Sequence, residues 1–355
     1  MKKGFCAGLA VCLLLTGCSG LPDAREMGDM ALLRTMGVDA AQAGVAVSGS
    51  TGPRAKGVQS EGEPALTLMA DRESLSAACL AMQGQSDSYV FFGYVDQLLV
   101  GEGLAAEGVR PVLDHFARNS ELGLGAQLWL VRGTTAREAV SSGGEEGVDK
   151  RLETLQHDSE MGIASISRTA GEVYADLLEL GSAFVPALTS AGEGGPLAER
   201  GYGVLIGDTL AGFLDGEEAK GLELLAGGPS ADILVGGEGR VSAKVTSAHT
   251  ASALEFQGGA PSVLKLHCQV TVRLVEYRRR PEGRELEALR QELEGQELAR
   301  LTAAVDRLQS LGADCAGLGA KAGIVHPARW QAVRGRWPEW FSQVPVEIQV
   351  EVKIL

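Results

Sequence analysis

The sequence predicts an α+β fold with several domains, in which mixed or antiparallel sheets are flanked by helices. Three observations favour this class. The chain has 355 residues, more than one hydrophobic core usually serves. Segments 264–274 and 346–354 alternate apolar and polar residues, as strands with one buried face do. Between them, a leucine stripe at helical spacing predicts a long helix packed on this C-terminal sheet.

The first eighteen residues predict a lipoprotein signal peptide at 1–17. Lys2 and Lys3 form a basic start, an apolar core follows, and Gly17 lets a peptidase reach the bond before Cys18. Cys18 would then be the mature N-terminus and the lipid attachment site. The alternative is an ordinary secretory signal in which Cys18 is incidental. The apolar core is far shorter than the roughly 20 residues of a spanning helix, so we expect a lipid anchor and no transmembrane helix.

Residues 18–195 are expected to form an N-terminal α+β region, as one unit or two subdomains. Residues 24–36 predict a short helix or loop. Gly108 should divide the helical stretch 102–117, because Pro111 fits only the first turn of a second helix. The remaining expected strands are 44–48, 66–69, 89–100 and 128–131, and the remaining expected helices are 73–83, 136–140, a segment through 155, and 173–180.

Residues 196–355 are expected to form a C-terminal α+β domain, because the glycine-rich run within 191–201 is typical of a linker. The domain should open with a hairpin around Gly207-Asp208. We expect the two long alternating strands to belong to an antiparallel sheet. The stripe of the long helix consists of Leu286, Leu289, Leu293, Leu298, Leu301, Val305 and Leu308.

The charge balance is strongly acidic. The chain has 32 basic and 46 acidic side chains, and residues 1–17 hold two of the lysines and no acid. An acidic mature chain is a poor partner for nucleic acid or for anionic lipid headgroups. We therefore predict no nucleic-acid partner and expect the acyl anchor to hold the protein at the membrane.

The cysteines do not predict a metal site. Cys6 and Cys12 would leave with the signal peptide, and Cys79, Cys268 and Cys315 are widely separated. A structural zinc site normally needs four clustered ligands. The three thiols are expected to be buried and free, or to include one disulfide; their role is left open.

No motif for catalysis or cofactor binding is present. Gly201-x-Gly203 and Gly317-x-Gly319 lack the complete dinucleotide fingerprint, and neither a P-loop nor a G-x-S-x-G sequence occurs. No H-E-x-x-H pair could hold a catalytic zinc. The histidines are scattered: His115, His157, His249, His267 and His326. We predict no catalytic residue, no metal and no cofactor, although catalytic residues can also meet from distant positions.

Aromatic side chains gather just before the last expected strand. Trp330, Trp337, Trp340 and Phe341 fall within twelve residues. Such a group packs in a core or forms a patch that faces a partner. The sequence favours the core and leaves the second role open.

Several segments in order are similar to one family. The most specific is 100–140, with Gly-Glu-x-Leu-Ala, Leu-Asp and Phe-x-Arg-Asn sequences. Before it, Asp23-Ala24-Arg25-Glu26 leads to Gly37-Val38-Asp39, and further matches begin at Gly207 and Ala313 and end with VPVEIQVEVKIL. The chain resembles the Ger(x)C spore germination lipoproteins, the C subunits of spore germinant receptors. Ser19–Pro22 and Gly123 depart from the family pattern.

The resemblance implies a lipoprotein on the outer face of the spore's inner membrane. It also implies two integral membrane partners, of A and B type, that take part in nutrient recognition, and it implies no catalytic residue. In the matched blocks we expect glycines to serve turns and close packing, and charged residues to form ion pairs or contact a partner. These residues are Gly101, Gly103, Gly108, Gly207, Gly221, Arg25, Asp114 and Arg118.

The expected function is that of a non-enzymatic receptor subunit required for spore germination. The main alternative is a solute-binding lipoprotein of a transporter, which would share the anchor and the outward location. Such proteins usually have two lobes rich in βαβ units, and the long alternating strands argue against that architecture. A cell-wall hydrolase is a third alternative. The partner interface, the nutrient and the oligomeric state are not predicted.

Overall fold

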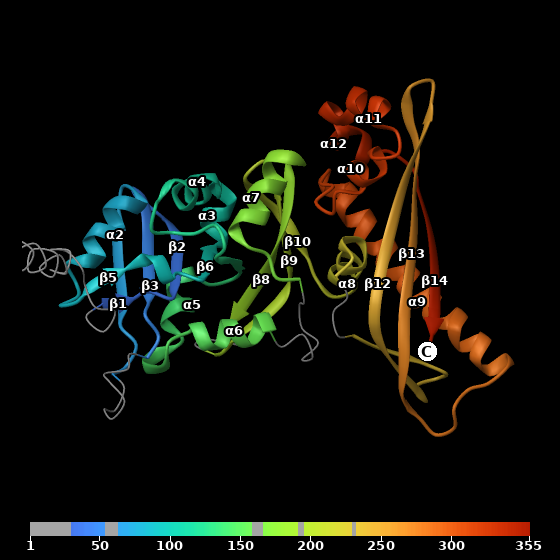
Figure 1. The fold of residues 1–355 in the computed structure, drawn as a ribbon, viewed down its shortest axis with the longest axis horizontal. Coiled ribbons are helices and arrows are strands. Elements are labelled where there is room, and N and C mark those ends of the chain that lie inside the picture. Colours follow the sequence, from blue (N-terminus) through green and yellow to red (C-terminus); the bar gives the residue numbers. More distant parts are fainter. Residues whose placement is uncertain (1–29, 54–62, 158–165, 191–194, 229–231) are drawn as a thin grey trace, which may run out of the picture.

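The computed structural model describes residues 30–53, 63–157, 166–190, 195–228 and 232–355. The expected signal peptide, Cys18 and Arg25 lie outside these residues. The described part contains an eight-stranded sheet with helices on both faces, a two-stranded sheet, and a separate four-stranded sheet (Figure 1). The α+β class with several sheets flanked by helices is thus confirmed.

The eight-stranded sheet has the order β10-β9-β8-β7-β6-β2-β3-β4. Its central strands β2, β6, β7 and β8 are parallel, and the outer pairs are antiparallel. The strands are β2 (Thr35–Ala41), β3 (Gly44–Ser50), β4 (Thr67–Arg72), β6 (Gln97–Gly101), β7 (Gln127–Val131), β8 (Ser182–Ser190), β9 (Leu197–Ile206) and β10 (Thr209–Leu214). Strand β6 is buried along its whole length, as parallel strands covered on both faces are.

Helices cover both faces of this sheet. One core contains side chains of α2, α3, α4 and α7, and a second contains side chains of α5 and α6. Capping boxes at Thr135 and Thr169 begin α5 and α7. The helices are α2 (Leu75–Gln83), α3 (Glu102–Glu107), α4 (Arg110–Arg118), α5 (Ala136–Ser141), α6 (Asp149–His157) and α7 (Ala170–Glu179). The expected helix break is confirmed, because Gly108 has φ +137° between α3 and α4.

The expectation of a helix or loop over residues 24–36 is wrong for its described part. β1 (Met30–Leu32) pairs in parallel with β5 (Tyr89–Phe91), and β2 begins at Thr35. Arg34, between the strands, pairs with Asp96 just before β6. Contacts with distant segments decide this structure, and a three-residue strand leaves too short a pattern to detect.

The four-stranded sheet has the order β11-β12-β13-β14. The long strands β12 (Val241–Gln257) and β13 (Ala260–Tyr277) form an antiparallel hairpin flanked by β11 (Ile233–Gly236) and β14 (Val346–Ile354). The two alternating segments of the sequence are β13 and β14, and both were expected to belong to an antiparallel sheet. This expectation is wrong for the contact between them, because β13 and β14 pair in parallel. A long helical connection returns the chain to the end of the sheet where β13 starts, which makes parallel pairing possible.

Helix α9 (Arg284–Leu311) packs on this sheet, as expected, and α8 (Gly216–Ala226) lies between the two large sheets (Figure 1). One residue of the predicted apolar stripe of α9 does not lie on the buried face of the helix. Leu298 is 39% exposed, whereas Glu297 is 1% exposed. The buried series runs through Leu293, Glu297 and Leu301 at steps of four, which keep to one helix face. Three short helices precede β14: α10 (Leu318–Gly323), α11 (Pro327–Val333) and α12 (Trp337–Phe341).

The eight-stranded sheet crosses the division expected between residues 195 and 196. β8 lies before this position and β9 after it, and the two strands pair from Ser182↔Ile206 to Ser190↔Leu197. The hairpin of β9 and β10, expected around Gly207-Asp208, therefore completes a sheet that begins near residue 35.

Helices α8 and α9 cross where Gly221 has no side chain. A Cβ atom at Gly221 would lie 2.1 Å from the backbone oxygen of Arg300, so Gly221→Ala should lower the free energy of unfolding by about 1 to 3 kcal/mol. A Cβ atom at Gly295, elsewhere on α9, would have no described neighbour within 4 Å, so Gly295→Ala should raise it by about 0.5 to 1 kcal/mol. Urea denaturation followed by tryptophan fluorescence measures both, and equal effects of the two substitutions would contradict the packing argument.

Candidate functional site

Two of the family-like segments, the one that ends at Asp39 and 100–140, meet at the end of β2. The carboxylate of Asp39 accepts hydrogen bonds from the backbone N–H groups of Ala136 (2.8 Å) and Arg137 (2.9 Å), in the first turn of α5. A Cβ atom at Gly101 would lie 2.0 Å from the Asp39 carboxylate. Burial raises the pKa of Asp39, and the two backbone donors oppose that shift. This contact fixes α5 against the sheet and explains why segment 100–103 needs a glycine.

A second meeting point joins α4 to the β9–β10 hairpin. The backbone N–H of Val109 donates to the carbonyl of Asp208 at 2.7 Å, and a Cβ atom at Gly108 would lie 2.9 Å from the Asp208 carboxylate. On α4, Asp114 accepts from the hydroxyl of Tyr174 (2.5 Å) and pairs with Arg118 (3.4 Å). Asp114 and Arg118, each expected to form an ion pair or to contact a partner, thus pair with each other.

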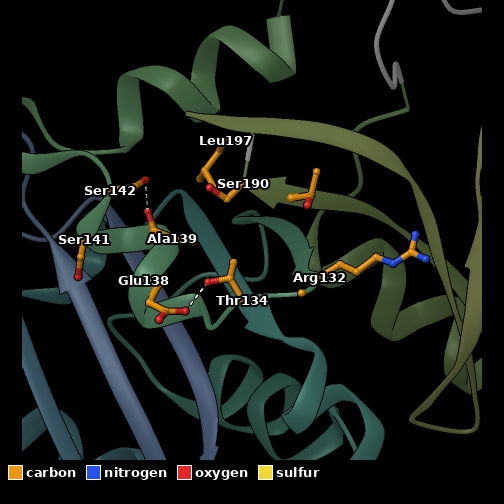
Figure 2. A pocket seen from close by; sticks show the side chains of 10 residues that line it. Arg132, Thr134, Glu138, Ala139, Ser141, Ser142, Ser190 and Leu197 are labelled. Atoms are coloured by element: carbon orange, nitrogen blue, oxygen red, sulfur yellow. Dashed lines mark hydrogen bonds between the residues drawn. The ribbon is translucent and has the colours of Figure 1, made fainter. Parts of the chain in front are cut away.

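A large hollow opens where the parallel strands β7 and β8 end, the usual place for ligands in such sheets. It measures about 660 Å³ and is lined by hydroxyl side chains and by Arg132 and Glu138. Arg132 points away from the hollow (Figure 2) and pairs with Asp215 at 2.7 Å. Glu138 bonds to Thr134 and caps α5. Arg132 is thus paired with a carboxylate, and Glu138 is held by hydrogen bonds to Thr134 and Thr135.

The aromatic group before β14 is divided between core and surface. Trp337 is 5% exposed and Phe341 is buried, and both belong to the C-terminal core. Trp330 and Trp340 are partly buried and pack against that core from outside. Trp330 and Trp337 meet edge to face, with ring centroids 5.2 Å apart. Core packing therefore accounts for two of the four aromatic side chains.

The three thiols of the described chain are free. Cys268 and Cys315 are buried and Cys79 is half-buried, so the disulfide alternative is wrong. Burial raises the pKa of all three thiols, that of Cys79 to about 11. They are accordingly poor nucleophiles at neutral pH, because the thiolate is the reactive form.

The described residues contain neither a metal-binding cluster nor a membrane-spanning helix. No three His, Cys, Asp or Glu side chains within residues 30–355, apart from the undescribed gaps, are grouped so that they could hold a metal ion. Over the same residues, no helix has the length and apolar character needed to cross a membrane. His267 lies on the exposed face of β13, 3.7 Å from Glu351, and His115 is half-buried on α4.

Two family models match the chain in order. The model described as "Spore germination protein N-terminal domain" matches residues 23–190, and "Spore germination B3/ GerAC like, C-terminal" matches residues 200–355. The chain belongs to the GerAC-like family of spore germination proteins. The resemblance noted in the sequence, to the C subunits of germinant receptors, is thereby confirmed. No curated protein matches this GerAC-like chain.

The fold of this GerAC-like protein also occurs in a solved structure. It is similar to "Crystal Structure of the GerBC protein", with a TM-score of 0.61 and 19% sequence identity. The match covers 90% of this chain and 96% of that chain. The two proteins therefore share a fold across both large sheets.

Sequence reasoning named several of these residues but missed how they meet. Asp39, Gly101 and Gly108 belong to family-like segments, whereas their contacts with Ala136 and Asp208 join positions far apart in the chain. The capping sequence Thr135-Ala136-Arg137-Glu138 was the available signal for α5. Nothing local indicated that an aspartate from β2 would cap the same helix.

Proposed function

We propose that this protein is the lipid-anchored, non-enzymatic C subunit of a nutrient germinant receptor. The observation that carries the proposal is the order of the two GerAC-type family models, which together span residues 23–190 and 200–355. The free thiols with raised pKa values are unsuited to act as nucleophiles at neutral pH, which fits the absence of a catalytic cysteine in this proposal.

In this proposal Cys18 carries acyl chains, and the described residues form an ectodomain outside the membrane. Each buried CH₂ of an acyl chain contributes about 0.8 kcal/mol, and two or more chains hold a protein stably. The ectodomain would assemble with two integral membrane subunits, of A and B type, on the outer face of the spore's inner membrane. Assembly, in turn, would support germination when a nutrient binds the receptor.

The test is a mild-detergent purification of the tagged protein from dormant-spore membranes. We expect two integral membrane proteins to co-purify with the wild type. Cys18→Ala should release most of the protein from the membrane fraction and reduce both partners severalfold, whereas Cys79→Ala, a matched substitution within α2, should change neither. Mass spectrometry of the N-terminal peptide should show the acyl modification.

Three results would overturn the proposal. Co-purification of transporter components would favour the solute-binding alternative, and turnover of peptidoglycan by the pure protein would favour a hydrolase. An unmodified Cys18 together with retained membrane binding would show that something other than this anchor holds the protein.

A further inference from the structure

One stretch of this acidic chain is basic. Residues 315–338 contain neither Asp nor Glu, although the whole chain has 46 acidic side chains against 32 basic ones. The basic side chains of the stretch are Lys321, Arg329, Arg334 and Arg336. The amine of Lys321 donates to a backbone carbonyl oxygen of α8 at 3.4 Å, which leaves the three arginines. They belong to α11 and to the turn that follows it, beside the tip of the β12–β13 hairpin (Figure 1), where Arg329 lies over the ring of Phe256.

The three arginines have little compensation from carboxylates. Arg329 and Arg334 are exposed, and among the described residues neither guanidinium forms an ion pair or a hydrogen bond. Glu179, at the end of α7, lines the same hollow as Arg334 without pairing with it. Nε of Arg336 lies 3.9 Å from Oε2 of Glu339, and both side chains are exposed, so this pair is weak. The guanidinium groups are therefore available to an anionic partner.

Exposed aliphatic side chains lie next to these charges, between α10 and α11. Ile324 is 77% exposed and Val325 is 66% exposed, and no large apolar side chain of the described residues is more exposed than Ile324. Trp330 and Trp340 are partly buried, and the guanidinium of Arg336 lies 5.6 Å from the ring centroid of Trp340. Aliphatic, indole and basic side chains together are typical of surfaces that lie at the headgroup level of a membrane. We call the surface formed by Ile324, Val325, Arg329, Arg334 and Arg336 the basic edge.

We propose that the basic edge docks on the anionic headgroups of a phospholipid membrane. Its guanidinium groups would pair with the headgroups, and Ile324 and Val325 would enter the boundary between headgroups and acyl chains. The same headgroups repel the acidic remainder of the surface, so the contact determines which side of the protein faces the membrane. A few basic side chains bind weakly and are released by salt. The contact therefore orients the protein and does not replace the anchor at Cys18, so this inference goes beyond the proposed function.

The experiment is co-sedimentation with vesicles of residues 18–355 carrying Cys18→Ala, which keep every described residue and can hold no acyl chain at position 18. Vesicles of phosphatidylcholine are compared with vesicles of equal parts phosphatidylcholine and phosphatidylglycerol. Binding to the anionic vesicles should be at least about tenfold tighter. It should be lost when salt rises from about 0.1 M to about 1 M, because the Debye length falls from about 10 Å to about 3 Å.

Substitution of arginines locates the contact. The double variant Arg329→Gln/Arg334→Gln should bind the anionic vesicles about tenfold more weakly or worse. The matched control is Arg278→Gln/Arg284→Gln, which also removes two exposed arginines. These two follow β13 at its end away from the hairpin tip, and the 18 residues of that strand span roughly 60 Å. The control variant should bind like the unsubstituted protein.

The apolar part of the contact has its own test. Ile324→Ser should weaken binding about fivefold or more, whereas Leu80→Ser, at a position of α2 that is 75% exposed, should not. Tryptophan emission should also shift to shorter wavelength on binding. Trp330 and Trp340 are the side chains that can report this shift, because the other two tryptophans, Trp129 and Trp337, are already buried.

The inference fails if neither kind of vesicle is bound, if both are bound equally, or if the control pair of arginines matters as much as the pair on the basic edge. Sedimentation velocity without lipid examines the other occupant of this surface. A dimer that is lost in Arg329→Gln/Arg334→Gln would show that a second copy of this acidic chain covers the basic edge, and would overturn the assignment to lipid. These measurements need neither an acyl chain nor a membrane subunit, so this inference and the proposed function fail separately.

Discussion

Arg300→Gln should lower the free energy of unfolding by about 3 to 5 kcal/mol, the usual cost of removing one partner from a buried ion cluster. Arg300 on α9 pairs with Asp232 (2.6 Å), Glu217 (2.7 Å) and Glu297 (3.3 Å). The side chain of Glu297 is 1% exposed. Burial raises the pKa of Glu297 and Arg300 opposes that shift, so the substitution would strand a carboxylate in the C-terminal core.

Urea denaturation followed by tryptophan fluorescence measures this loss. Arg279→Gln is the matched control, because Arg279 pairs at 2.8 Å with Glu285 but both side chains are exposed, and exposed pairs contribute about 1 kcal/mol or less. Replacing both Arg300 and Glu297 by methionine should recover much of the lost stability, since no buried charge remains at position 297. A loss below about 1 kcal/mol for Arg300→Gln would contradict the assignment of a buried cluster.

Glu199→Gln should stabilise the protein in mildly alkaline solution and have little effect in acid. Glu199 is 8% exposed on β9, and burial, with a smaller contribution from Glu223, raises its pKa from 4.5 to about 8. Lys220 and Arg151 oppose the shift. The folded state holds this proton over a range in which the unfolded chain has released it, so the contribution of Glu199 to stability falls as pH rises from about 4.5 to about 8.

The expected difference between Glu199→Gln and the wild type is therefore near zero below pH 4.5. It grows to at most about 5 kcal/mol above pH 8, because each unit of pKa shift corresponds to about 1.4 kcal/mol. Unfolding free energies measured across this range test the prediction. Glu107→Gln, on the exposed side of α3, should show no such dependence. If the stability advantage of Glu199→Gln over the wild type disappeared at high pH, the pH dependence would have the opposite sign. That result would exclude a raised pKa for Glu199.

Local patterns were sufficient to predict most of the elements. Alternation of apolar residues located β13 and β14, and leucine spacing located α9, because both periods are properties of the backbone itself. The direction of the β13–β14 pair could not be predicted, since alternation looks the same in parallel and antiparallel strands. The burial of Glu297 was also missed, because Asp232, which shares its ion partner Arg300, lies on another segment.

The candidate sites were less accessible from the sequence than the elements. The glycines at 101 and 108 stood out only within family-like segments, and their packing against Asp39 and Asp208 is long-range.

The pairing of β8 with β9 has a consequence for dissecting the molecule into fragments. A fragment that stops at residue 190, where the first family model ends, would leave the β8 edge without its neighbour. An open strand edge presents unpaired N–H and C=O groups and is a template for aggregation. A fragment that stops after Leu214 would instead retain all eight strands. Limits chosen from the sheet, and not from sequence families, are therefore the rational basis for soluble halves of this protein.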